Sequence, residues 1–146
     1  MNTKHTPIDE KQLQDAKSTT HGSAALTIAR NGVIDAIEAG TYGYFSWIGY
    51  SKTYENGDYL AGSFDYGHDL PPGTHVREFP DLYAYLNDID GVQYGAGHIK
   101  AGKFTVKVER SGQYFKHDVV VEGVTFEHAG QIVVIDGELS VSSNDE

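Results

Sequence analysis

The sequence predicts an all-β fold, an antiparallel β-sandwich or flattened barrel of about eight strands built from hairpins, with a short N-terminal helix or arm. Composition is the first observation: 17 Gly, ten Tyr and six Phe but only four Pro are typical of many short strands joined by turns. The second is a series of two-residue turn signals, at Asn31-Gly32, Asn56-Gly57, Ser111-Gly112 and Asp136-Gly137. At 146 residues, the chain fits one domain with a real core.

The domain organisation is expected to be simple. We expect three parts: a flexible N-terminal arm over residues 1–22, a single β domain over 23–141 and a C-terminal tail over 142–146. Within the arm, Thr6 can cap a helix that has Pro7 at its first position and acids in its first turn. This helix would be short, because the segment Lys17–Gly22 ends it. The residues before about Gly22 are expected to be loosely held or disordered.

The first hairpin is predicted at Asn31-Gly32, because Asn-Gly tolerates positive φ at both central positions of a tight loop. It joins residues 24–29 to residues 33–39, whose apolar side chains fall on one face. Asp35 would then lie on that apolar face opposite Ile28. Either Asp35 is near an edge of the sheet or the register differs.

The densest aromatic run lies in Thr41–Gly67, and we expect it to form one hairpin closed by Asn56-Gly57. A two-residue loop there pairs Tyr54 with Tyr59, and side chains alternate between faces from that register. One face is expected to be core: Phe45, Trp47, Leu60, Phe64 and Tyr66. The other is expected to be a tyrosine-rich ligand-binding face: Tyr42, Tyr44, Tyr50, Tyr54, Tyr59 and Asp65.

The tyrosine-rich face has two interpretations. A tyrosine has an apolar ring and a hydroxyl that needs a partner, so such a face suits a half-wet surface that stacks on a sugar or docks a protein. Alternatively, a second layer of sheet or the N-terminal segment covers these tyrosines, and they belong to the packed interior.

The segment after the aromatic run is less regular. Residues 68–78 are expected to form a long connection, since Pro71-Pro72-Gly73 cannot donate regularly to a β-ladder. Phe79–Asp90 is predicted as a strand because its apolar residues alternate with tyrosines. Pro80-Asp81 could also open a short helix there.

The last third of the chain returns to clear hairpins. Residues 98–110 are predicted as a strand, and Ser111-Gly112 closes the next hairpin. This turn sets six side chains on one face: Phe104, Val106, Val108, Phe115, His117 and Val119. At Asp136-Gly137, the chain is expected to turn or bulge into the last strand.

The charge is strongly acidic and concentrated in the middle of the chain. The formal net charge is −10, and residues 31–90 carry ten acids against two bases. This field repels phosphate backbones, so we expect no nucleic-acid partner, whereas a basic protein surface or a cation would be attracted.

With no cysteine, disulfides and cysteine metal sites are excluded. No apolar run approaches membrane-spanning length, so as written the chain is expected to be cytoplasmic, or surface-exposed or secreted if an export signal was removed.

Two segments have part of a known ligand-binding motif but lack residues that the motif needs. Gly97–Lys103 has the spacing of a phosphate-binding loop, but Phe104 replaces the Ser or Thr that would hold magnesium, and the segment runs into a strand. Asp88–Gly91 has part of a calcium-loop pattern, yet Leu86 stands where the first carboxylate should be. It is interpreted as an Asp-Gly turn.

Metal and catalytic patterns are weak. Five histidines could meet in the fold, but none has the tight spacing of a ligand pair: His68, His75, His98, His117 and His128. There is no Gly-x-Ser-x-Gly elbow and no cysteine nucleophile, so we expect no enzyme, cofactor or metal site. Asp65 with nearby His68 is the one candidate pair for acid–base chemistry.

The segment Ala101–Leu139 combines an Ala-Gly start, an alternating strand, a Ser-Gly turn and a final Asp-Gly-Glu-Leu strand. This order resembles small β-sandwich domains of bacterial surface lipoproteins. Gly-Thr-aromatic strand starts of that group are similar to Gly40-Thr41-Tyr42 and Gly73-Thr74-His75. The resemblance implies a surface or ligand-binding module without an assigned activity, and it transfers no functional residue.

The leading functional hypothesis is a non-enzymatic module that binds a glycan or a protein through the tyrosine-rich face. One alternative is an acidic inhibitor or immunity-type protein that binds a basic partner. Another is a barrel that holds a small apolar ligand or a metal. The sheet edges and the tyrosine-rich face would each allow homo-oligomerisation.

Overall fold

The computed structural model describes residues 10–144, which form one antiparallel sheet of ten strands and a single α-helix. In chain order the elements are α1 (Glu10–Thr19), β1 (Thr20–Arg30), β2 (Val33–Tyr44), β3 (Trp47–Thr53), β4 (Tyr59–Asp65), β5 (Gly73–Glu78), β6 (Tyr83–Asn87), β7 (Gln93–Tyr94), the 3₁₀ turn η1 (Ala96–His98), β8 (Ile99–Ser111), β9 (Tyr114–His128) and β10 (Gln131–Ser143). Across the sheet, the strand order is β5-β8-β9-β10-β1-β2-β3-β4-β6-β7.

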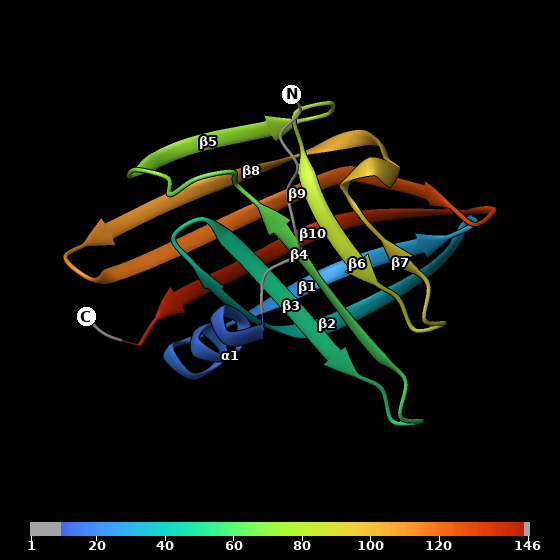
Figure 1. Ribbon diagram of the computed structural model, residues 1–146, viewed down its shortest axis with the longest axis horizontal. Helices are drawn as coiled ribbons and strands as arrows, with labels where there is room; N and C mark the ends of the chain where they lie inside the picture. The colour runs from blue at the N-terminus through green and yellow to red at the C-terminus, as the bar shows by residue number, and fades with distance from the viewer. Residues whose placement is uncertain (1–9, 145–146) are drawn as a thin grey trace.

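The sheet curls into a half-barrel, in which β3, β4, β6 and β7 cross over β8, β9 and β10 (Figure 1). Aromatic contacts join the two layers: the ring centroids of Phe64 and Phe104 lie 5.4 Å apart, and those of Tyr94 and Phe126 lie 5.6 Å apart. The all-β prediction is confirmed. The described strands belong to one continuous sheet of ten, where about eight strands in a sandwich or flattened barrel were expected.

The curl coincides with irregular pairing in the long strands. The register between β9 and β10 shifts between Ile135 and Gly137, and a β-bulge of this kind increases the local twist. Gly137 has φ of +139°, and a side chain there would collide with the backbone of β1 at Ala25 and Leu26. The predicted bulge at Asp136-Gly137 is therefore present, and it needs the glycine.

Two predicted hairpins are confirmed. Asn31 and Gly32 have φ of +51° and +87° and close β1 onto β2, with Asp35 opposite Ile28 as expected. In the β8–β9 hairpin, Ser111 pairs with Tyr114, and all six side chains predicted on one face are buried.

The aromatic run does not form a single hairpin, which corrects the prediction for Thr41–Gly67. β2 runs without interruption through Tyr44, turns at Phe45-Ser46 and returns as β3, so Thr41 pairs with Tyr50. The run thus contributes the end of β2, β3 and β4, three neighbouring strands of one sheet.

The register of β3 against β4 also differs from the prediction by one residue. Thr53, not Tyr54, pairs with Tyr59. Gly57 takes a positive φ of +95° but Asn56 does not; instead, the Asn56 side-chain oxygen accepts a 2.9 Å hydrogen bond from the Asp58 amide. The loop is therefore longer than two residues. Because a one-residue slip exchanges the faces of a strand, this shift decides which aromatic side chains are core.

The termini and the central connection differ in part from expectation. The predicted cap at Thr6 and Pro7 lies outside the described residues. The predicted short N-terminal helix is confirmed as α1. The rest of the expected flexible arm is strand from Thr20 onward, and β10 extends into the expected tail as far as Ser143. Within residues 68–78, where a connection was expected, β5 forms after the prolines and pairs with β8. The predicted strand within residues 79–90 is confirmed as β6.

Among the described residues, no helix combines the length and apolar character needed to cross a membrane.

Candidate functional site

An aromatic groove lies on the outer face of the sheet, over β3, β4, β6 and β7 and beside α1. It has a volume of about 260 Å³ and is mostly apolar. We call it the outer groove; it is lined by Leu13, Tyr42, Trp47, Gly49, Ala61, Gly62, Ser63, Tyr85, Leu86, Asn87, Gln93 and Tyr94.

The floor of the outer groove is made of small residues. Gly49 of β3 pairs with Ser63 of β4, and Ala61 follows two positions away on the same face. Their neighbours in sequence point to the other side of the sheet, where Ile48, Leu60 and others fill the core. Strand alternation thus places bulky residues inside and leaves a shallow trough outside.

One wall of the groove is an aromatic pair. The rings of Tyr42 and Trp47 meet edge to face with centroids 6.1 Å apart, and Leu13 and Ala16 of α1 pack against them. The ammonium of Lys17 lies 5.0 Å from the centre of the Tyr42 ring. Burial, and to a lesser extent electrostatic repulsion from Tyr59, raises the pKa of Tyr42 to about 12. The Tyr42 hydroxyl therefore stays neutral at physiological pH.

Gly49 provides the space in which the aromatic wall stands. A Cβ atom at this position would lie 2.5 Å from Cε1 of Tyr42 and 3.1 Å from Cζ3 of Trp47. We expect Gly49→Ala to displace both rings, to lower the free energy of unfolding by about 1–3 kcal/mol and to increase acrylamide quenching of Trp47, the single tryptophan. Gly40→Ala is the matched control, because a Cβ there meets nothing within 4 Å. Equal effects of the two changes would contradict this role of Gly49.

The opposite side of the groove carries amide groups. Asn87 of β6 pairs directly with Gln93 of β7, and both line the groove beside Tyr85. Each amide offers donors and an acceptor to a ligand. None of the lining residues carries an acidic or basic side chain, although the chain as a whole has a net charge of −10. The lining of the groove is therefore uncharged, although the Lys17 ammonium lies over the Tyr42 ring.

The structure separates the six predicted site residues. Tyr42 lines the outer groove. Tyr44 and Tyr59 are 45% and 42% exposed and share the outer face with Asp65 by strand alternation. Asp65 accepts a 2.8 Å hydrogen bond from the Gly67 amide.

Tyr50 and Tyr54 do not belong to this face. Tyr50 is fully buried in the core, where desolvation strongly raises its pKa. Tyr54 is half-buried, and its hydroxyl donates a 2.9 Å hydrogen bond to Asp35. The predicted pairing placed both with Tyr42, and the one-residue register shift and the turn at Phe45-Ser46 remove them.

Several groove residues were missed from the sequence. Trp47 was expected in the core and instead stands in the outer wall, where α1 leaves it only 2% exposed. Asn87 and Gln93 come together because β6 and β7 pair across a short turn. The Asp88–Gly91 turn signal was recognised, and it could have indicated that its flanking residues lie side by side.

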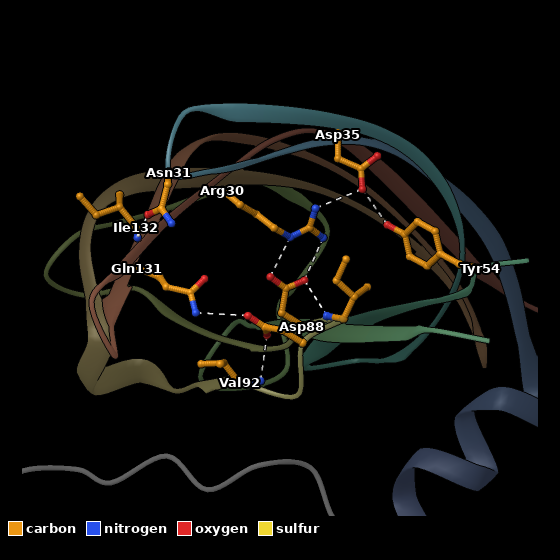
Figure 2. A network of polar contacts seen from close by, with 10 residues as sticks. Arg30, Asn31, Asp35, Tyr54, Asp88, Val92, Gln131 and Ile132 are labelled. Carbon is orange, nitrogen blue, oxygen red and sulfur yellow. Dashed lines mark hydrogen bonds and ion pairs between the residues drawn. The ribbon is translucent and has the colours of Figure 1, made fainter. Parts of the chain in front are cut away.

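A buried ion pair lies where the β6–β7 turn meets β1 (Figure 2). The guanidinium of Arg30 donates two 2.8 Å hydrogen bonds to Asp88 and a third, at 3.1 Å, to Asp35. The Asp88 side chain is 0% exposed, and these carboxylates raise the pKa of Arg30. Asp90 accepts hydrogen bonds from the Val92 amide and from Gln131 of β10, and the first of these lowers its pKa most. The network fastens the turn that carries the amide side of the groove.

Asp65 and His68 each bond to a backbone group close in sequence, and the described histidines belong to no group of three or more metal-binding side chains. Asp65 bonds to Gly67, whereas Nδ1 of His68 donates to the Asp69 carbonyl. His117 lies in the core, hydrogen-bonded to Tyr66. Within residues 10–144, no three side chains of metal-binding type are grouped around one point.

Comparisons of the chain with protein families, with curated proteins and with solved structures found no match.

Proposed function

We propose that this protein is a non-enzymatic binding module that holds a neutral carbohydrate in the outer groove. The observation that carries the proposal is the combination, in one groove with an uncharged lining, of an aromatic wall, a floor of small residues and a pair of amides.

These features suit the two surfaces of a sugar ring. The faces of a pyranose carry C–H groups, which pack on an aromatic ring such as Tyr85, which lines the groove. Its edge carries hydroxyls, which need donors and acceptors of the kind that Asn87 and Gln93 provide. The groove volume of about 260 Å³ is just below the usual range for small-molecule sites, about 300–1,000 Å³, so a small ligand is expected.

A groove-filling substitution tests the proposal. A glycan array would select a neutral oligosaccharide, and calorimetry would measure its affinity. We expect Ala61→Leu, which fills the floor, to weaken binding by more than about tenfold, or 1.4 kcal/mol, with little change in melting temperature. Ala36→Leu makes the same change on the exposed outer face of β2, away from the groove, and should leave binding intact. The assignment would be refuted if the wild-type chain bound no neutral glycan, or if Ala61→Leu left the affinity unchanged.

Salt dependence separates this proposal from an acidic inhibitor or immunity-type protein. Binding in a groove with an uncharged lining should change little between low and high ionic strength. Recognition of a basic protein by the acidic middle of the chain should weaken steeply over the same range. A partner protein that is captured only at low salt, and whose binding is insensitive to Ala61→Leu, would favour the inhibitor.

A further inference from the structure

Two histidines attach one side of the outer groove to the body of the sheet. His98, at the end of η1, stacks on His128, the last residue of β9, with ring centroids 3.8 Å apart and planes 20° apart. Tyr94 of β7 meets the His128 ring edge-on at 6.1 Å. We call residues 93–98 the β7–η1 corner. Only two residue pairs join β7 to β6, and the corner is held in addition by these ring contacts and by Tyr94, which is 1% exposed and packs against Phe126 in the core.

The corner requires a neutral His98. Nδ1 of His98 accepts a 3.0 Å hydrogen bond from the Gly95 amide, and the His98 amide donates one of 3.0 Å to the Gly95 carbonyl. An imidazolium carries protons on both nitrogens and has no acceptor. Protonation of His98 therefore breaks the hydrogen bond from the Gly95 amide.

The surrounding groups favour the neutral state at physiological pH. Burial first, and then the positive charges of His128 and Lys100, hold the pKa of His98 below its usual value. Glu127 neighbours His128 on β9 but points to the opposite face by strand alternation. From β10, Gln131 pairs with His128, and its side chain donates a hydrogen bond to Asp90 of the β6–β7 turn.

We propose that His98 and His128 form a pH-sensitive clamp, closed at neutral pH and released by acid, that controls the β7–η1 side of the outer groove. Gln93 and Tyr94 belong to this corner and also line the groove, so its release removes one side of the site. The effect on a ligand depends on the proposed carbohydrate-binding function, whereas the clamp itself does not.

Amide hydrogen exchange tests the clamp without a ligand. The Gly95 and His98 amides report the corner, and the Val133 amide, in a fully buried strand segment, reports global opening. After correction for intrinsic exchange, we expect the protection of the corner amides relative to Val133 to fall on acidification from about pH 7.5 to about pH 5. The fall should be at most about tenfold per pH unit for one proton taken up. Unchanged relative protection would overturn the clamp.

A conservative variant separates titration from packing. In His98→Asn, the side-chain oxygen replaces Nδ1 as acceptor but does not titrate, so the corner should stay protected at both pH values. His68→Gln, a change at an exposed histidine outside the corner, should retain the wild-type pH response. Loss of protection on acidification in His98→Asn, as in wild type, would refute the role of His98.

A binding experiment with the oligosaccharide selected on the array tests whether the clamp affects the groove. The affinity of the wild-type protein for this oligosaccharide should fall on acidification, whereas the affinity of His98→Asn should not. Equal falls in affinity would refute coupling to the groove. If no glycan binds at neutral pH, the carbohydrate proposal fails, and the exchange experiment still decides whether the clamp exists.

Discussion

Arg30→Ala is expected to lower the free energy of unfolding by about 3–5 kcal/mol. The substitution removes the three hydrogen bonds that the guanidinium donates and leaves the carboxylate of Asp88, which is fully buried, without its counter-charge. Breaking a buried pair in this way costs more than the pair contributes, because a desolvated charge is left uncompensated. The loss would be measured by urea denaturation at neutral pH.

The partner substitutions give this prediction its controls. Arg30→Lys keeps the charge but cannot make the two-pronged contact to Asp88, so it should fall between wild type and alanine. The double change Arg30→Met with Asp88→Leu replaces the pair by apolar side chains and should recover much of the stability. A loss below about 1 kcal/mol for Arg30→Ala, the usual value of an exposed pair, would show that the network does not fasten the β6–β7 turn.

The fold was predictable where a local turn signal determines the pairing. Asn31-Gly32 takes the two positive φ values that its sequence suggests, and the β1–β2 register follows. Asn56-Gly57 is the same dipeptide but forms a different loop. Here the side-chain oxygen of Asn56 accepts a hydrogen bond from the Asp58 amide, and the two-residue turn does not form. The turn at Phe45-Ser46 contains no Gly, Pro, Asn or Asp, and Ser46 alone is a weak turn signal.

The candidate site was predictable only in its chemistry. Aromatic residues with polar groups on an outer sheet face were anticipated, and Tyr42 is among them. The other residues that line the groove depend on strand register and on contacts between residues distant in sequence. Trp47 lies on the outer face where Tyr50 was expected, Tyr50 lies in the core where Trp47 was expected, and β6 and β7 supply the amides. The Arg30–Asp88 pair spans 58 positions in sequence, a separation that no motif or periodicity indicates.

The buried histidine His117 links the stability of the fold to pH. His117 of β9 is 0% exposed, and its Nδ1 is 3.0 Å from the Tyr66 hydroxyl, to which it is hydrogen-bonded. Desolvation, together with the positive charge of Arg110, lowers the pKa of His117 from 6.5 to about 4. The folded protein therefore accepts a proton at this site less readily than the unfolded chain does.

Acidification is consequently expected to destabilise the fold through His117. Its contribution is intact above about pH 6.5, falls as the pH drops through the interval to about 4 and reaches a loss of about 3 kcal/mol when both states are protonated. Urea denaturation of wild type and of the double variant Tyr66→Phe with His117→Phe would be compared across this interval. The variant removes both polar groups from a core position flanked by Phe104 and Phe115, so it should be about as stable as wild type at neutral pH and more stable in acid. A stability difference that stays constant from pH 7 to about pH 4 would show that His117 does not titrate with folding, and the acid sensitivity of the protein would have to come from other groups.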